Sequence, residues 1–251
     1  VNTVPTYAAA GTTATFTRAT TATTRDSNGL LRTIASSSPR SYYDSNNFYR
    51  GYLPEPQRTN VCLQSEDFAL TGPWDSSAAV TMVKNIVGPD GVANSGTTLT
   101  WTNTVDTVRQ DIARTAGQTD VASVWVKEGN TTFTVIQFAF LGGTTKDAYA
   151  GVQWSDHTVA AYGGDAANLT ATIEAWGNGW YRVTAKHVDT GANTSCRIAG
   201  FPSTTGSNIA VGTVLAFGAQ VELNSTFASS YIPTTTVALS GGRVWWEETP
   251  A

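Results

Sequence analysis

The sequence predicts an all-β fold, an antiparallel two-sheet sandwich of the jelly-roll type with an extended N-terminal arm and an extended C-terminal tail. Three observations lead to this prediction. Strand-like segments recur along the middle of the chain with turn residues between them. Helical periodicity is almost absent. The chain has 251 residues, which is enough to bury a core without stabilising disulfides or metal ions.

Residues 1–60 are rich in Thr, Ser, Asn and Arg and contain no long apolar run. Residues 26–29 form a turn signal that ends in a glycine, which tolerates positive φ. Pro39, Pro54 and Pro56 stiffen the backbone that follows and disfavour helix. We expect an extended arm with a few short strands. It should lie on another part of the protein, because it cannot carry a core of its own.

Residues 61–224 are expected to form the sandwich. The expected strands are short segments with alternating or continuous apolar character. They cover residues 78–85, 96–102, 108–113, 120–129, 131–142, 148–155, 158–164, 168–176, 179–188, 194–201 and 213–223. Residues 128–130 and 177–179 predict tight hairpin turns, because both combine glycine with asparagine.

Residues 225–251 form the predicted tail, which returns to Ser and Thr and ends near the pair Trp245 and Trp246. Tryptophans at a chain end are more often packed than free, because burial of each ring is worth roughly a few kcal/mol. We expect this pair to dock on the body, on the arm or on a neighbouring subunit.

Charge and hydropathy exclude two classes of partner. The formal net charge is −4, only 14% of residues are charged, and the 15 Lys and Arg residues are scattered. Without a basic run to follow a phosphate backbone, we expect no nucleic-acid partner. No apolar run approaches the ~20 residues that span a bilayer, so we expect no membrane insertion.

The sequence contains two cysteines, Cys62 and Cys196. Spacing alone does not say whether they meet, so a disulfide and two free thiols both stay open. We favour two buried free thiols, since unpaired cysteine behaves as a small apolar residue.

Catalytic and metal motifs give weak signals. Neither His157 nor His187 lies near a nucleophile elbow, and we expect no catalytic residue. Glu128, Glu174 and Glu222 are candidates for glycoside hydrolysis, which needs two carboxyls roughly 5 to 9.5 Å apart. The sequence gives no such pairing, and we favour strand carboxylates that face solvent, which explain these residues without any catalysis. No zinc or EF-hand pattern occurs, and we expect no cofactor and no metal. Residues 104–111 and 123–132 carry oxygen side chains suited to a structural Ca²⁺, but nothing else supports that ion.

A sheet face that binds glycans is the sharper hypothesis. Side chains alternate between the two faces of a strand, so polar and aromatic residues between core positions share the opposite face. The candidates are Trp125, Lys127, Gln137, Tyr149, Gln153, Arg182 and Gln220. Rings can stack on a sugar, while amide and guanidinium groups bind its hydroxyls. The alternative is that the arm or a neighbouring subunit covers this face, or that it is ordinary solvated sheet.

Several motifs together resemble one family of virion proteins from tailed bacteriophages. The first is "FTRATTATTRDSNGLLRTI" with "SPRSYYD", and the second is "GYLPEPQRTNVCLQSEDF" from Gly51 to Phe68. The body motif "WGNGWYRVTA" and the closing "FGAQVELNSTFASSYIPTT" match the same family. The resemblance covers about residues 14–236. Pro54 and Pro56 around Glu55 and the ending "GGRVWWEETPA" depart from the family pattern.

The resemblance implies a jelly roll like a carbohydrate-binding module, carried on a phage particle in a tail fibre, tail tip, head fibre or capsid-decorating protein. It supplies no catalytic residues. We therefore expect a non-enzymatic structural protein on the virion surface. It would contact other virion proteins, form a homo-oligomer (a trimer is favoured) and bind a host-surface polysaccharide. A dedicated glycan-binding adhesin is the alternative, and a polysaccharide depolymerase is the third hypothesis.

The segment from Gly51 to Phe68 is predicted to be a joint between arm and sandwich. It lies where the hydroxyl-rich arm ends and the strand pattern begins, and it lacks the partners of an active site. We expect Arg40, Glu55 and Arg58 to hold this joint through charge-assisted hydrogen bonds. Trp245 and Trp246 are predicted to join them in assembly.

Overall fold

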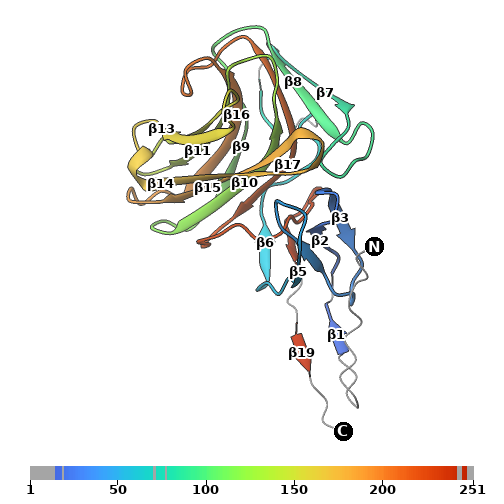
Figure 1. The fold of residues 1–251 in the computed structure, drawn as a ribbon. Coiled ribbons are helices and arrows are strands. Elements are labelled where there is room, and N and C mark those ends of the chain that lie inside the picture. The colour runs from blue at the N-terminus through green and yellow to red at the C-terminus, as the bar shows by residue number, and fades with distance from the viewer. Residues whose placement is uncertain (1–14, 19, 70–71, 77, 242–244, 248–251) are drawn as a thin grey trace.

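The computed structural model describes residues 15–18, 20–69, 72–76, 78–241 and 245–247. The protein is all-β, and every strand pair in the described residues is antiparallel (Figure 1). Two large sheets form the body. The small sheets β2–β3 and β4–β5 lie at one end of it, with β1 and β19 beyond them.

The first large sheet has six strands and the second has five. In spatial order, the six-stranded sheet contains β14 (Leu169–Ala175), β15 (Trp180–Val188), β10 (Thr119–Lys127), β17 (Gly212–Glu222), β8 (Gly96–Trp101) and β7 (Val80–Ile86). The five-stranded sheet contains β13 (Thr158–Tyr162), β12 (Tyr149–Gln153), β11 (Phe133–Leu141), β16 (Ser195–Ser203) and β9 (Val108–Ala113). The 3₁₀ turns η1 (Ala166–Asn168) and η2 (Gly177–Gly179) flank β14.

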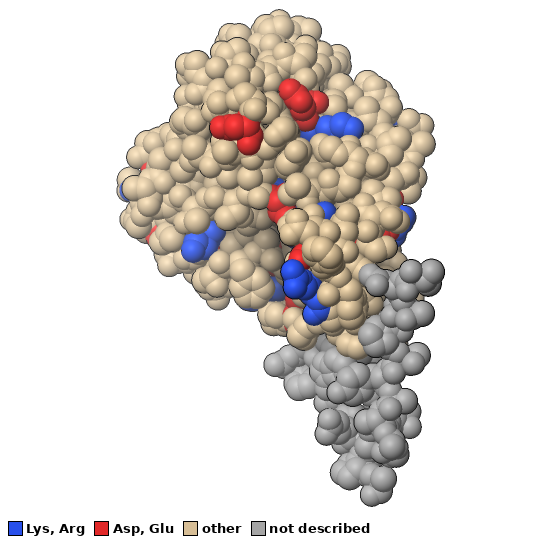
Figure 2. Space-filling view, viewed as in Figure 1, with Lys and Arg blue, Asp and Glu red and all other residues tan. Residues whose placement is uncertain are grey.

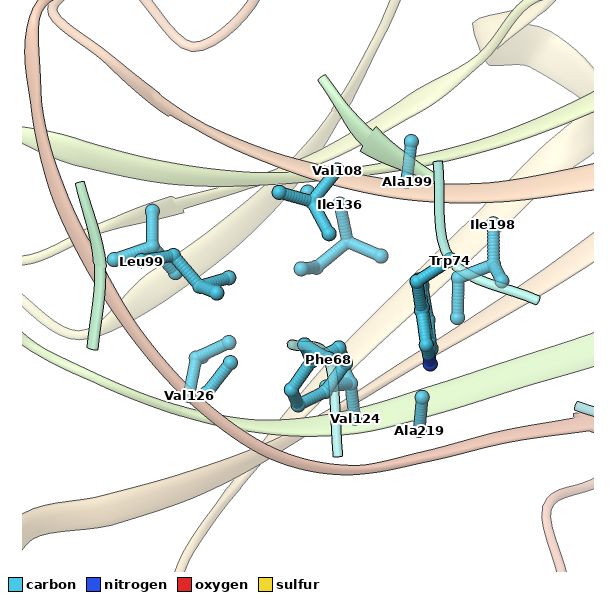
Figure 3. A pocket seen from close by; sticks show the side chains of 13 residues that line it. Phe68, Trp74, Leu99, Val108, Val124, Val126, Ile136, Ile198, Ala199 and Ala219 are labelled. Carbon is cyan, nitrogen blue, oxygen red and sulfur yellow. The ribbon is translucent and has the colours of Figure 1, made fainter. Parts of the chain in front are cut away.

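The two large sheets enclose one hydrophobic core. Val124 and Val126 of β10 and Ile136 and Phe138 of β11 belong to the same buried cluster, as the sequence alternation predicted. Figure 3 shows side chains from both sheets around a small apolar cavity of about 20 Å³, with Trp74 at its side. A space of this size holds about one water molecule, so it is a gap in the packing of the core and not a ligand site.

Each strand predicted for the body is present, within a few residues at its ends. The predicted hairpin at 177–179 is confirmed, because η2 joins β14 to its antiparallel neighbour β15. The predicted hairpin at 128–130 is wrong. That segment carries the chain from β10 in one sheet to β11 in the other. It passes so close to β17 that a Cβ on Gly129 would lie 2.0 Å from the Thr213 carbonyl oxygen, which explains the glycine without a hairpin.

The N-terminal residues form short paired strands. The pairs are β2 (Ala22–Arg25) with β3 (Leu31–Ile34), β4 (Ser41–Tyr43) with β5 (Tyr49–Tyr52), β6 (Arg58–Asn60) with β18 (Leu239–Gly241), and β1 (Thr15–Thr17) with β19 (Trp245–Glu247). The division of the chain into arm, sandwich and tail stays a prediction.

The first two hairpins repeat one turn. Asp26 accepts hydrogen bonds from two following backbone N–H groups and from Arg32 at 2.7 Å. Asp44 does the same and accepts a hydrogen bond from Arg50 at 2.7 Å. The sequences "DSNGLLR" and "DSNNFYR" thus encode the same turn twice, each held by an Asp–Arg pair.

The outer face of the six-stranded sheet is covered by the chain itself. Trp125 and Trp180 project from this face into a cluster with Phe217, and all three are buried. Leu31 of β3 and Tyr231 complete the cluster. Tyr231 belongs to residues 225–241, which follow β17 and are called the C-terminal segment below. The Tyr231 ring centroid lies 5.1 Å from that of Trp125 in an edge-to-face arrangement. The N-terminal and C-terminal segments therefore bury aromatic side chains that would otherwise face water.

Hydrogen bonds fix the C-terminal segment on this face. Glu222 accepts the Ser229 N–H at 2.9 Å and the Ser229 hydroxyl at 2.6 Å. Gln220 accepts the Ile232 N–H at 2.8 Å, and Asn60 donates to the Ile232 carbonyl at 2.8 Å. Buried polar side chains on the sheet thus take the place of water for the backbone of this segment.

The predicted joint residues meet the same segment. Arg40 pairs with Glu55 at 2.9 Å, and Glu55 accepts the Ser230 N–H at 2.9 Å. The Arg58 guanidinium lies 4.7 Å over the Phe227 ring. Their role in assembly stays a prediction. For Trp245 and Trp246, the backbone lies in β19, but the side chains are outside the described part of the structure.

Cys62 and Cys196 are both buried and free, which confirms the prediction of two buried free thiols. Burial raises the pKa of the Cys196 thiol to about 12, so this sulfur stays protonated at neutral pH.

A buried ionic cluster ties four parts of the body together. Arg114 follows β9 and contacts Asp120 of β10 and Asp189 after β15, and none of the three side chains is exposed. Arg114 also donates to the carbonyls of Gln118 and Asn193, both at 2.8 Å. Burial alone would raise the pKa of Asp189, but hydrogen bonds from backbone N–H groups and from the Asn193 amide outweigh it and lower that pKa.

We predict that Asp189→Ala destabilises the protein by about 3–5 kcal/mol, because it leaves the buried Arg114 short of a partner. Denaturant unfolding measures this loss. The control is Asp111→Ala, whose partly exposed pair with Arg197 contributes at most about 1 kcal/mol. Because the pKa of Asp189 is lowered on folding, its contribution is present above about pH 4 and disappears as pH falls through the folded-state value. Equal losses in the two variants would contradict this account.

Candidate functional site

The outer face of the five-stranded sheet carries an open row of polar side chains. Antiparallel register places Tyr149 opposite Gln137, Gln137 opposite Ala199, and Ala199 opposite Arg109. Directly paired residues point to the same face, so the row crosses β12, β11, β16 and β9.

Asp147, just before β12, orients one end of the row. Its carboxylate accepts a hydrogen bond from the Gln137 amide at 2.6 Å and another from the Tyr149 hydroxyl. Burial, together with this hydrogen bond and the negative charge of Asp147, raises the pKa of Tyr149. The Tyr149 ring also packs edge-to-face on Phe201, with centroids 5.9 Å apart. Both polar side chains are thus held in fixed positions.

Two arginines form the other end. Arg197 makes a two-point ion pair with Asp111, with both N–O distances at 2.7 Å. Arg109 pairs with Asp75 and lies 3.7 Å from Asp106. The loops 104–107 and 207–209 form the walls of the groove, which has a volume of about 550 Å³. We call this space, lined by Arg109, Gln137, Tyr149, Arg197, Phe201 and the two loops, the outer groove.

The outer groove can bind a polar, uncharged ligand with many hydroxyl groups. Its amide, phenol and guanidinium groups are hydrogen-bonding partners for hydroxyls, and the ring of Tyr149 offers apolar surface, backed by the buried ring of Phe201. Its cationic groups are paired with carboxylates, so the groove carries little unbalanced charge. Figure 2 shows the same trend on the face drawn there, where charged side chains are few and separated by wide uncharged areas.

The predicted glycan-binding residues fall on two different sheets. Gln137 and Tyr149 lie in the outer groove. Gln153 lies on the same face, but four residues further along β12, which is about 13 Å. It donates to Ser155 at 2.9 Å and does not line the groove.

The other four predicted residues lie on the six-stranded sheet, where the open face was expected. Trp125 and Gln220 are fully buried there, so their predicted exposure is wrong. The physical reason is the cover formed by residues near Leu31 and Tyr231. Lys127 is at the end of β10, with its ammonium 2.7 Å from the Asn178 carbonyl. Arg182 donates to the Ser229 carbonyl of the C-terminal segment at 2.8 Å. A role of any of these residues in glycan binding stays a prediction.

Sequence reasoning missed Arg109, Asp147 and Arg197. A signal for Arg197 was present, because it stands between the buried residues Cys196 and Ile198 and must therefore point outward. Arg109 alternates in the same way with Val108. Asp147 lies just before β12, outside the predicted strand 148–155, so the alternation was not applied to it.

His187 is closed to ligands, whereas His157 is exposed. His187 is fully buried, with its ring nitrogens 2.8 Å from the Phe138 carbonyl and 2.8 Å from Asp165. Within the described residues, no three side chains of the metal-binding types gather around one point, and no helix is long and apolar enough to cross a membrane.

Comparisons with known proteins give one structural likeness to report. Neither the family models nor the curated protein sequences match the chain. Among solved structures, the enzymatically active domain of tailspike protein 4 from bacteriophage CBA120 is similar, with 16% identity and a TM-score of 0.38. The match covers 64% of this chain and 20% of the tailspike chain. A likeness of this size does not determine family or activity.

We predict that Tyr149 stays un-ionised at pH values where ordinary tyrosines, with a pKa of about 10, have lost their proton. Ultraviolet titration of the protein minus that of Tyr149→Phe isolates this phenol. Asp147→Asn should shift its ionisation to lower pH, because the negative charge and its hydrogen bond hold the proton. Since the pKa is raised on folding, the contribution of Tyr149 to stability is complete below about pH 10 and is lost above it. Ionisation of Tyr149 at the ordinary value would contradict the geometry described for the outer groove.

Proposed function

We propose that this protein is a non-enzymatic component of a bacteriophage virion surface whose outer groove binds glycans. The observation that carries the proposal is the contrast between the two sheets. The segments around Leu31 and Tyr231 cover the outer face of the six-stranded sheet, while the five-stranded sheet keeps an open groove of oriented polar groups.

The phage assignment is supported by the combined motifs in residues 14–236. On this proposal the body is a jelly roll like a carbohydrate-binding module. The N-terminal and C-terminal segments lie together at one end, where β1 pairs with β19, which suits attachment to other virion proteins. We propose a homo-oligomer, with a trimer favoured, in which the outer grooves face outward from the particle. No cofactor is required.

The structure of the outer groove suits binding more than bond cleavage. Hydrolysis of a glycosidic bond uses two carboxyls, one of them free to donate a proton. Among the described lining residues of the groove, the carboxylate is Asp106, which accepts the Thr107 N–H at 2.8 Å and lies 3.7 Å from Arg109. Beside the groove, Asp147 is occupied by Gln137 and Tyr149, and Asp111 is occupied by Arg197. Their hydrogen bonds make these carboxylates positioning groups for the side chains that would meet a sugar.

A glycan array followed by calorimetry tests this function. We expect binding to at least one polysaccharide, weakened about tenfold by Gln137→Ala and similarly by Tyr149→Ala, because each removes about one or two hydrogen bonds. Gln153→Ala is the matched control, since it lies on the same sheet face outside the groove, and it should bind normally. The absence of any glycan ligand, or equal weakening by the control, would overturn the proposal. New reducing ends after incubation with a polysaccharide would overturn its non-enzymatic part.

A further inference from the structure

A second cleft lies between the N-terminal hairpins, the C-terminal segment and the edge of the six-stranded sheet. It has a volume of about 200 Å³. Its chemically distinctive lining residues are Arg25, Tyr42, Glu174, Trp176, Arg182 and Ser229. We call it the junction cleft. It is smaller than the outer groove. The arginines of the outer groove are paired with carboxylates, whereas Arg182 in the junction cleft has no carboxylate of the described residues within ion-pair distance.

Arg182 is a cation without a carboxylate partner. No ion pair within 4.0 Å involves it among the described residues, and its two hydrogen bonds go to neutral oxygens, the Ser123 hydroxyl at 2.9 Å and the Ser229 carbonyl at 2.8 Å. Its Nε atom is buried and has no hydrogen-bond partner. The guanidinium rests on the Trp125 ring, with its Cζ 4.7 Å from the centroid. Removing a charge from water without a partner is costly, so this position needs an explanation.

Arg25 also lines the cleft, but protein groups occupy its guanidinium: Nη1 donates to the Ala175 carbonyl, and Nη2 donates to the Ser45 carbonyl and the Asn47 amide oxygen, both at 3.4 Å. Its side chain is only 4% exposed, and its Nε is also buried without a partner. Its ion pair with Glu174 is long, at 3.7 Å, and the Glu174 side chain remains 41% exposed. Arg182 is therefore the guanidinium group of this cleft that has no carboxylate within ion-pair distance among the described residues, whereas Arg25 is held by protein groups. Glu55, the other carboxylate of the lining, is already held by Arg40 and Ser230.

We infer that the junction cleft binds a carboxylate-bearing sugar, such as a uronic acid unit of an acidic polysaccharide. A guanidinium group binds a carboxylate through parallel hydrogen bonds, which are about twice as strong as neutral ones. The phenol of Tyr42, the hydroxyl of Ser229 and the Trp176 ring suit the remaining hydroxyls and the apolar face of a sugar. The volume of the cleft fits one small ligand rather than a long chain segment. This inference goes beyond the proposed function, since it concerns a different site and a different class of glycan.

Calorimetry with digalacturonate and the full chain tests the inference, with the neutral disaccharide digalactose and inorganic phosphate as comparison ligands. We expect digalacturonate to bind more tightly than either. Arg182→Gln should weaken digalacturonate binding at least tenfold, because it removes a charged hydrogen-bond donor. Arg32→Gln is the matched control and should leave this binding unchanged, because Arg32 is an exposed arginine paired with Asp26 that lines neither the junction cleft nor the outer groove.

Glu174→Gln separates binding from folding. It removes a negative charge at the cleft, so digalacturonate should bind a few-fold more tightly, a gain that a damaged fold does not produce. Weaker or unchanged binding in Glu174→Gln would overturn the inference. Equal affinity for digalactose, or equal weakening by Arg182→Gln and Arg32→Gln, would also overturn it. Tighter binding of inorganic phosphate would identify a general anion site instead of an acidic-sugar site. Gln137→Ala should not affect digalacturonate, which keeps this result distinct from the outcome for the outer groove.

Discussion

Burial of Trp125 on the outer face of the six-stranded sheet is the constraint on which the rest of the structure depends. A large aromatic side chain in the centre of a sheet face must be covered, because leaving it in water forfeits roughly 1.5–3 kcal/mol or more. The cover comes from both ends of the chain, through Leu31 and Tyr231. The backbone adapts to it at Gly218, where φ is +63° and an added Cβ would lie 3.1 Å from both the Trp125 and the Tyr231 rings.

This cover explains the distribution of function that we propose. Once the two chain ends occupy one sheet, the other sheet keeps the open face, and the outer groove forms there between β9 and β12. Apolar groups alone cannot fill the space between the six-stranded sheet and the C-terminal segment that covers it, because the backbone of this segment needs hydrogen-bond partners. Gln220 and Glu222 supply them, while Arg182 remains at the edge of this segment without a carboxylate partner in the described part of the chain. The junction cleft is thus a consequence of the same cover.

The sequence predicted the strands well and the environment of their faces poorly. Period-two alternation identified β9 to β17 because each strand has one face in the core, where apolar residues are required. It could not say which outer faces are open, since that depends on where Leu31 and Tyr231 pack, far away in the sequence. Trp125 was therefore expected in a binding face, and Gln137 and Tyr149 were correctly placed on an outer face without knowledge of Asp147. The segment 128–130 was misjudged because glycine with asparagine serves a crossover between sheets as well as a hairpin.

The most direct test of the covered face is hydroxyl-radical footprinting of the full-length protein, read by mass spectrometry at single residues. Trp125 is fully buried and Phe48, on the turn between β4 and β5, is 63% exposed. We predict that Phe48 is oxidised readily while Trp125 stays protected, although an indole in solution is the more reactive ring. Oxidation of Trp125 at a rate equal to or above that of Phe48 would show that the chain ends do not cover this sheet, and it would contradict the account.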